Sequence, residues 1–264
     1  MNYTCYNKKN LHLIKNSWNA YYPNNQILTN NNKKIWNFLQ KNLLSKCNNE
    51  KCWLKQDFIT NKINHNFDKY TFAPKSPESW EKNPTEWLSS VDIIKIMQQY
   101  EYQYPSFKFI GPSPIDFDHR KSFGQCVWND LCNLDIKKLY NNNITKIGII
   151  LNTDTHDLDG SHWICAYIDL KKKFVFSFDS NADKHPKEKH NLFKKILQQA
   201  LSINIKLEFI KNTMEHQKSN TECGMYCLFT IIQLLTNKMK LIDFNKRIPD
   251  KLMIKMRKTI FNQL

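Results

Sequence analysis

The fold of this chain is constrained most by one apolar segment, residues 225–235, which directly follows a cysteine and a glycine. The segment is apolar on nearly every face of a helix, so it predicts a helix buried inside a globular domain. Polar residues precede Cys223, which places its thiol at the start of this helix. The positive end of a helix dipole favours thiolate over thiol, and thiolate is the nucleophilic form. The segment therefore predicts a nucleophile at Cys223, against the alternative of a buried structural thiol.

Two side chains upstream can activate such a thiol. Strand-like runs at residues 162–169 and 173–179 are separated by a short Lys-rich turn, which predicts a β-hairpin. The hairpin would bring His162, at the start of its first strand, beside Asp179, at the end of its second strand. We expect His162 to take the thiol proton and later to protonate the leaving amine. We expect Asp179 to accept a hydrogen bond from the Nδ1–H of that imidazole and so to fix its tautomer.

Alternatives remain for both roles. His156 and His216 lie in expected loops, and neither faces an acid across a hairpin. Asp179 also fits an ordinary strand-ending turn, since the sequence Asp-Ser-Asn-Ala-Asp is typical of turns. Asn181 and Asp183 are then the alternative partners of the histidine.

The sequence also predicts a role or a position for other residues around the cysteine. The amide of Gln217 can donate to the oxyanion of a tetrahedral intermediate, together with backbone N–H groups near the cysteine; an ordinary surface glutamine is the alternative. Gly224 leaves room for a substrate backbone beside the nucleophile. Cys227, one helical turn later, and Cys165, inside a strand, are expected in the core.

The order of these residues resembles that of the adenain/Ulp1 superfamily of cysteine proteases, and within it the polyprotein proteases of large DNA viruses. Papain-like enzymes have the order Cys, His, Asn, which is different. The likeness covers about residues 147–235 and rests on His162 with Trp163, on Asp179, on Gln217, and on Cys223 with Gly224. It implies an Ulp1/adenain-like core in which a buried helix starts at the catalytic cysteine. In the viral branch Asn stands at the place of Asp179, so the resemblance implies that an amide is accepted there.

A second resemblance concerns two tryptophans. The segment from Trp87-Leu88 to Asp92 is similar to the Trp-Leu-x-Asp segment of SUMO proteases, with extra spacing before the aspartate. In that family this tryptophan and the one after the catalytic histidine form a narrow tunnel that admits only a Gly-Gly backbone. The resemblance implies that Trp87 and Trp163 bind substrate and that cleavage follows small residues. Without it, both would be assigned to a core, as most tryptophans are.

Apolar periodicity predicts an α+β fold in which helices flank a mixed sheet. Three prolines between Ala73 and Pro84 indicate a linker, so we expect a mostly helical N-terminal arm at residues 1–84 and the catalytic domain at residues 85–264. Further strands are predicted at residues 146–151 and 205–210, and a loop at residues 105–114. Helices are predicted at residues 30–44, 58–67, 86–99 with Thr85 as cap, 125–140 and 185–201, and after Pro249. The expected inward residues are Trp87, Leu88, Val91, Ile94 and Gln98 in the helix at 86–99, and Leu252, Ile254, Met256 and Ile260 in the last helix.

The chain of 264 residues has a formal net charge of +15, from 39 Lys and Arg against 24 Asp and Glu. Such an excess attracts polyanions, including nonspecific DNA; a codon bias toward Lys and Asn is the alternative explanation. Some proteases of the superfamily that this chain resembles use DNA as an activating surface. We therefore expect no required cofactor and leave activation by DNA or a peptide open. No zinc-finger spacing or basic-aromatic module supports sequence-specific binding.

Eight cysteines and a polar start without an apolar leader predict free thiols in a reducing compartment. Cys47 and Cys52 lack a matching second pair, and Cys126 and Cys132 lie on a predicted helix, so we expect no metal site. No apolar run is long enough to cross a bilayer, so we expect no membrane span.

Together these features predict a cysteine endopeptidase that cleaves protein substrates at Gly-Gly-X sites. The predicted role is the maturation of viral capsid or core polyproteins, in the virion and host cytoplasm and not as a secreted protein. One alternative keeps the chemistry and is an isopeptidase that removes SUMO or ubiquitin-like tags. Another belongs to a different class and is a protease-like protein that only binds nucleic acid.

Overall fold

The computed structural model describes residues 3–59, 66–121, 123–183 and 187–262. Contacts between residues divide the chain into two compact units, Met1–Ala73 and Pro74–Leu264. No helix within the described ranges is long and apolar enough to cross a membrane.

The first unit is helical. Three of its helices begin after an asparagine whose side-chain oxygen accepts a backbone N–H, as N-cap residues do. An aromatic core that includes Trp18, Trp53 and Phe58 packs between the helices. The helix predicted at residues 30–44 is confirmed, whereas part of the one predicted at 58–67 lies outside the described residues. The helices are α1 (Lys8–Tyr21), α2 (Asn32–Leu43), α3 (Glu50–Trp53) and α4 (Asn66–Thr71), with a 3₁₀-helix at Asp57–Ile59.

The second unit is built on a five-stranded mixed sheet in the order β1-β2-β3-β4-β5. The outer pairs β1–β2 and β4–β5 are parallel, and the inner pairs β2–β3 and β3–β4 are antiparallel. The predicted hairpin is therefore confirmed as β3 and β4. Every residue of these two strands is buried, as expected for strands covered on both faces. The strands are β1 (Phe107–Pro114), β2 (Lys146–Asn152), β3 (Trp163–Asp169), β4 (Phe174–Phe178) and β5 (Glu208–Lys211).

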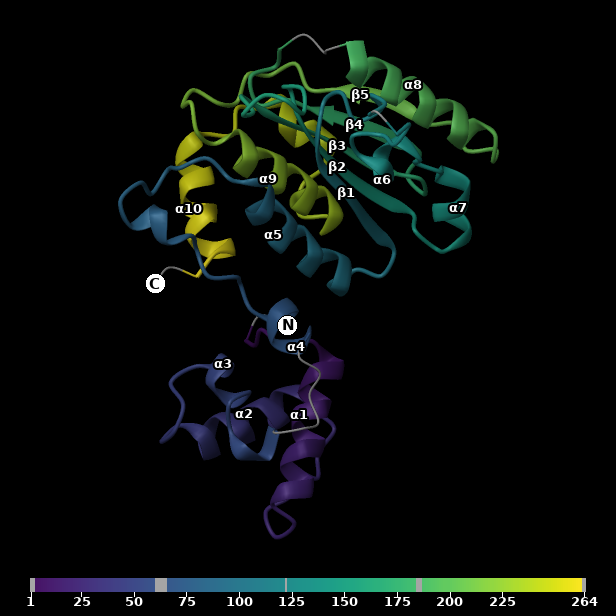
Figure 1. Cartoon of the computed structure of the whole chain (residues 1–264). Coiled ribbons are helices and arrows are strands. Elements are labelled where there is room, and N and C mark those ends of the chain that lie inside the picture. The colour runs from purple at the N-terminus through teal and green to yellow at the C-terminus, as the bar shows by residue number, and fades with distance from the viewer. Residues whose placement is uncertain (1–2, 60–65, 122, 184–186, 263–264) are drawn as a thin grey trace. The chain divides into compact units, whose positions relative to one another are not determined.

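Helices cover both faces of this sheet (Figure 1). One face packs against α5 (Ser90–Gln103), α9 (Cys223–Leu235) and α10 (Asp250–Ile260), and the other against α6 (Asn129–Cys132), α7 (Ile136–Asn141) and α8 (Lys187–Leu201). The predicted α+β fold and the buried helix that starts at Cys223 are confirmed. The first two residues of the helix predicted at 185–201 lie outside the described residues. Short 3₁₀-helices occur at Glu78–Glu81 and Leu241–Asn245.

The prediction of a loop at residues 105–114 is wrong, because most of this segment forms β1. Its prolines and glycine are tolerated because β1 is an edge strand that pairs on one side only. Gly111 has a φ of +114° and precedes a cis peptide bond to Pro112. A Cβ at Gly111 would lie 2.5 Å from the Ile150 carbonyl oxygen, so this position requires glycine.

The helix predicted at residues 86–99 begins later than expected. Ser89, not Thr85, is its cap, and it forms a capping box with Asp92. The predicted inward face is only partly confirmed, since Leu88 is buried but Val91 is 57% exposed. The buried residues of α5 are Asp92, Ile93, Ile96 and Met97.

Two other helical predictions need correction. Residues 125–140 are helical only in α6 and α7, which are short. In α10 the exposed residues include Leu252 and Ile254, while Met253 and Arg257 are buried. Met256 and Ile260 are partly buried against the core.

Residues 74–84, which the sequence assigns to a linker of the N-terminal arm, belong to the second unit. Lys75 forms a β-bridge with Asn262, and the Trp80 ring packs edge-on against Phe261 at 4.9 Å. The three prolines of this segment are therefore compatible with tight packing against the residues that follow α10.

Candidate active site

His162 directly precedes β3 and Asp179 directly follows β4, so the antiparallel pairing of these strands brings them together. His162 Nε2 lies 2.8 Å from Asp179 Oδ1. The prediction that Nδ1 makes this contact is wrong, because the carboxylate meets the Nε2 edge of the ring. Asn181 donates its N–H to Asp179 at 3.0 Å, and Asp183 lies farther along the same cleft.

Cys223 is the first residue of α9, and its thiol is one of the groups that raise the pKa of His162. Burial lowers the pKa of His162, but hydrogen bonds to Asp179 and Cys223 outweigh burial and raise it to about 9. Burial favours the neutral form of Asp179, but the hydrogen bond and charge of His162 lower its pKa. The site thus brings a carboxylate, an imidazole and a thiol together at the start of a helix. The thiol is not open to solvent, since Cys223 is only 1% exposed.

Asn212, the residue after β5, holds the backbone of Asp179. Its Oδ1 accepts the Asp179 N–H at 2.8 Å, and its Nδ2 donates to the Asp179 carbonyl oxygen at 2.8 Å. Asn212 is buried, so water does not compete for these bonds. Sequence reasoning missed this residue because nothing in its context distinguishes it from the many other asparagines of the chain.

Gln217 lies between β5 and α9 and lines the same cleft as His162 and Asp179. Its Oε1 accepts the hydroxyl of Ser180 at 2.8 Å, and its Nε2 donates to the Ser219 carbonyl oxygen at 2.6 Å. Sequence reasoning also missed Ser180, although its place directly after Asp179 is a usable signal.

The alternative histidines lie apart from this cluster. His156 Nδ1 is 2.6 Å from Asp116 Oδ2, an acid that follows β1 in the sequence. His216 is fully buried, and its Nδ1 accepts the Ile248 N–H at 3.0 Å. Burial and the charge of Arg247 lower the pKa of His216 to about 4. A neutral and enclosed imidazole has a structural role and cannot exchange protons with the thiol.

Trp87 and Trp163 line the same cavity at different depths. Trp87 is 37% exposed, whereas Trp163 is 7% exposed and donates its Nε1–H to the Leu88 carbonyl oxygen at 3.0 Å. The space beside Gly224 is filled, because a Cβ there would lie 3.0 Å from Leu88 and 3.2 Å from Trp163. The prediction that Gly224 leaves room for a substrate is therefore wrong; it allows α9 to pack closely on these two side chains.

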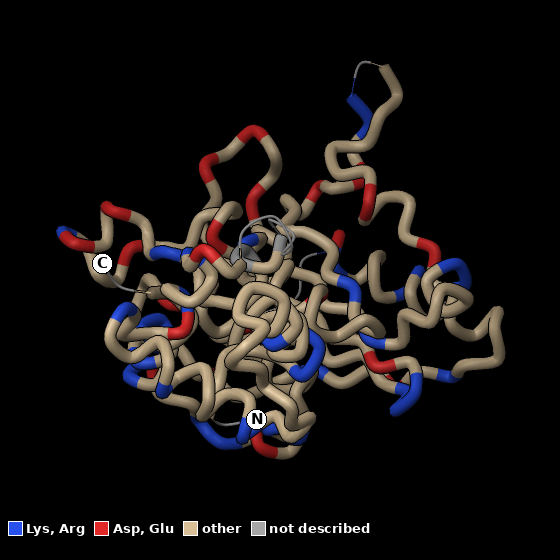
Figure 2. Tube along the Cα trace, turned by 90° about the horizontal axis from the view of Figure 1, so that it is seen from below, with Lys and Arg blue, Asp and Glu red and all other residues tan. Residues whose placement is uncertain are grey.

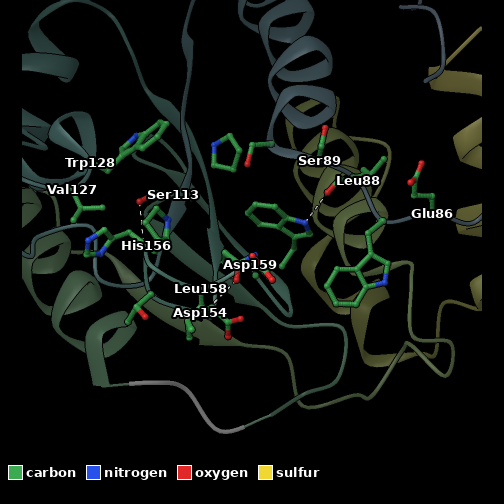
Figure 3. Close-up of a pocket in the computed structure, with 18 of the residues that line it drawn as sticks. Glu86, Leu88, Ser89, Ser113, Val127, Trp128, Asp154, His156, Leu158 and Asp159 are labelled. Carbon is green, nitrogen blue, oxygen red and sulfur yellow. Dashed lines mark hydrogen bonds between the residues drawn. The ribbon is translucent and has the colours of Figure 1, made fainter. Parts of the chain in front are cut away.

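Two neighbouring cavities share Trp87 in their walls. One, of about 880 Å³, is lined by His162, Asp179 and Gln217. The other, of about 670 Å³, extends away from these residues. Adjoining open cavities of this kind suit an extended peptide better than a compact small molecule. Figure 3 shows the second cavity, with Val127, Trp128 and His156 on one side, and Glu86, Leu88 and Ser89 on the other.

Four of the eight cysteines are paired, so the prediction of free thiols is wrong for them. Disulfides join Cys47 to Cys52 and Cys126 to Cys132, pairs that are close in sequence and brought together by local turns. Two of the free cysteines, Cys165 and Cys227, lie in the core as predicted. Burial raises the pKa of Cys227, which keeps it protonated and unreactive.

Glu222, directly before Cys223, is fully buried and forms an ion pair with Arg257 of α10. Burial raises the pKa of Glu222, and the charge of Arg257 opposes this shift. The pair connects the residue before the cysteine to a helix near the end of the chain. The polar sequence around Glu222 gave no indication of this buried contact.

Comparison with known proteins places this geometry in a family. The profile of the Ulp1 protease family, C-terminal catalytic domain, matches residues 133–264, half of the chain. A protein of Acanthamoeba polyphaga mimivirus named as a thiol protease is 33% identical over 192 residues, which are 72% of this chain and 61% of that protein. A cysteine protease of African swine fever virus, named a SUMO-1 cysteine protease in another isolate, is 26% identical over 252 residues, 87% of this chain and 88% of that one.

A crystal structure of the African swine fever virus protease has the same fold. Its TM-score to this chain is 0.63, with 25% identity, over 87% of this chain and 89% of the other. The region matched by the family profile contains the cysteine at the start of α9, the histidine bonded to it and the aspartate bonded to that histidine. The chain belongs to the Ulp1 protease family of cysteine peptidases.

Proposed function

We propose that the chain is an endopeptidase in which Cys223 is the nucleophile, His162 the acid and base, and Asp179 the residue that orients the imidazole. The hydrogen bond between His162 and Asp179, together with the place of Cys223 at the start of α9, is the observation that supports this most. The thiolate attacks the scissile carbonyl carbon, and His162 gives its proton to the leaving amine. His162 then takes a proton from water, whose hydroxide attacks the thioester and displaces the Cys223 thiolate. The carboxylic acid product loses its proton to solvent, and the thiolate and imidazolium are restored.

Gln217 stabilises the oxyanion in this proposal. Its Nε2 carries two N–H groups, of which one donates to the Ser219 carbonyl oxygen. The other, together with the unpaired N–H groups at the start of α9, can donate to the negative oxygen of the tetrahedral intermediate.

We propose that cleavage follows small residues, with Gly-Gly-X as the preferred site. Trp87 is partly exposed beside the cleft. Trp163 is buried, and its Nε1–H is held by a hydrogen bond to the Leu88 carbonyl oxygen. Two indole rings near the nucleophile leave little width for substrate side chains, which favours glycine. Because the matched relatives are viral, we propose capsid or core polyproteins as substrates, cut in the virion and host cytoplasm without a required cofactor.

An isopeptidase acting on SUMO or ubiquitin-like tags is a second candidate. Such tags end in Gly-Gly, so the same cleft would serve, and one viral relative is named a SUMO-1 cysteine protease. The two candidates differ in whether a folded tag is recognised in addition to the Gly-Gly segment.

A third candidate, from another class, is binding to nonspecific DNA or another polyanion. Residues 1–73 contain eleven Lys and no Arg against three Asp and Glu, so they carry +8 of the formal charge of +15. Basic residues occur all along the chain (blue in Figure 2). Fluorescence anisotropy of Cys223→Ala with duplex DNA at low and high salt would measure this binding. Binding no stronger than that of a neutral protein would remove this candidate and DNA activation with it.

The deciding experiment is mass spectrometry after incubation of the protein with a Gly-Gly-X peptide panel and with a SUMO-tagged substrate, beside folded Cys223→Ser. Peptide cleavage after Gly-Gly with SUMO untouched supports the endopeptidase. Release of SUMO supports the isopeptidase. Equal activity of Cys223→Ser would refute the nucleophile, and inactivity of the wild type on both substrates, with and without DNA, would refute the peptidase proposal.

A further inference from the structure

The residue after Asp179 contacts the residue proposed to bind the oxyanion. We propose that Ser180 is a positioning residue for the reaction, which holds the amide of Gln217 so that an N–H faces the oxyanion. This inference rests on the proposed peptidase function and adds a residue to its machinery.

The hydrogen bonds of Gln217 identify which end of its side-chain amide is the nitrogen and which is the oxygen. The Ser219 carbonyl oxygen can only accept, so the amide atom 2.6 Å from it must be the nitrogen. The other end is then the oxygen, and it accepts the Ser180 hydroxyl at 2.8 Å. Ser180 is 1% exposed and Gln217 is 5% exposed, so water does not replace either bond. One N–H of the amide remains for a ligand.

Ser180 also holds the backbone of this loop. Its carbonyl oxygen accepts the N–H of His216 at 2.8 Å and the N–H of Gln217 at 3.0 Å. Asp179, one residue earlier, is held on both sides of its backbone by Asn212. Asp179 orients the histidine and Ser180 orients the oxyanion donor. These residues are consecutive, so the single peptide unit between them sets how far apart their side chains lie.

Loss of the Ser180 hydroxyl would release the amide at its oxygen end. The terminal torsion of glutamine is broad, so without this bond the amide samples other orientations. An amide turned over would present its oxygen to the oxyanion and repel it. Because the oxyanion exists only in the tetrahedral state, the effect should fall on kcat and not on KM.

The test is a double-mutant cycle of Ser180→Ala and Gln217→Ala on a Gly-Gly-X peptide. We expect kcat to fall about tenfold in Ser180→Ala and about a hundredfold in Gln217→Ala, with KM nearly unchanged. The double mutant should match Gln217→Ala, because Ser180 acts through that amide. Thr230→Val is the matched control, since it removes another buried hydroxyl, one without a hydrogen-bond partner in the described part of the chain, and should keep the wild-type kcat.

Several outcomes would overturn the role of Ser180. One is a wild-type kcat in Ser180→Ala, and another is a double mutant whose loss equals the product of the single losses. A Gln217→Ala variant with wild-type kcat, beside an inactive Cys223→Ser, would overturn it while the nucleophile stands. If the wild type cleaves nothing, NMR exchange of the Gln217 side-chain N–H groups still decides. Faster exchange in Ser180→Ala supports the positioning, and unchanged exchange refutes it.

Discussion

Arg257 of α10 places one guanidinium nitrogen 3.2 Å from the Glu222 carboxylate. A second nitrogen donates to the Glu86 carbonyl oxygen at 2.7 Å, and the guanidinium lies 4.4 Å from the centre of the Trp80 ring. Both charged side chains are almost completely buried. Arg257 therefore connects the residue before Cys223 to the residue before Trp87.

We expect Arg257→Met to lower the free energy of unfolding by about 3–5 kcal/mol, because it leaves the Glu222 carboxylate buried without its partner. The double variant Glu222→Gln/Arg257→Met should recover most of this loss, since no lone charge remains buried. Urea denaturation measures both. Glu78→Gln, which breaks the exposed pair with Lys75, is the control and should change stability by about 1 kcal/mol or less. A near-wild-type stability of Arg257→Met would contradict this account of the buried pair.

Peptidase activity should decline as the pH rises through about 9, the pKa of His162, because the imidazolium that protonates the leaving amine is lost. Asp179→Asn keeps a hydrogen-bond acceptor but removes the negative charge, so the pKa of His162 should fall toward 6.5. The alkaline limb of the pH–rate profile should therefore move to lower pH, with kcat at neutral pH reduced up to about fourfold. An unmoved limb would show that a group other than His162 sets it.

The same raised pKa has a consequence for stability. The pKa of His162 is about 9 in the folded chain and 6.5 without its partners, so the folded state binds the extra proton. Its contribution is fully present below pH 6.5 and is lost as the pH rises to about 9. The stability difference between wild type and Asp179→Asn, measured by urea denaturation, should shrink across this window. A difference that stays constant would contradict the assigned ion pair.

His216 should have the opposite pH dependence. Its pKa is lowered to about 4, so the unfolded chain binds the extra proton between pH 6.5 and 4, and stability falls as the pH falls through that window. The loss should be on the order of 3 kcal/mol. His216→Asn, which retains an acceptor for the Ile248 N–H, should reduce this pH dependence. The exposed His190→Asn should leave it unchanged.

Gly224→Ala tests the close packing of α9. Alanine gains about 1 kcal/mol of helix propensity, but a Cβ 3.0 Å from Leu88 and 3.2 Å from Trp163 costs about 1–3 kcal/mol in overpacking. We expect a small net loss of stability and a larger loss of activity, because Trp163 must move. Gly148→Ala creates a similar 3.0 Å contact with Ile231 and Phe107, away from the cleft. It should lower stability but keep kcat, and equal losses of kcat in both variants would refute a local effect on the site.

The residues that meet in the cleft could be predicted because their types and order are distinctive in the sequence. A hairpin brings His162 and Asp179 together, and an apolar helix begins at Cys223, so local pattern alone indicates most of the geometry. Which imidazole nitrogen faces the acid could not be predicted, since it depends on the direction from which the β4 end approaches the ring.

Other features depend on contacts that sequence patterns do not encode. The edge strand β1 resembles a loop, because an edge position tolerates the same Gly and Pro residues that turns use. Ser180 and Asn212 act by orienting other groups, and such residues carry no chemical signature of their own. Arg257 looks like one of many surface cations until the fold places it against Glu222.

The distance between Glu222 and Arg257 along the chain affects the order in which the site is completed during synthesis. The two residues are 35 positions apart, so Cys223 is synthesised before the partner of its neighbour. Until Arg257 is made, the Glu222 carboxylate has no cation with which to form a buried ion pair, and it stays hydrated. We therefore expect the start of α9 to close late in the folding of the second unit, and a newly made chain to acquire its arranged thiol only once α10 has docked.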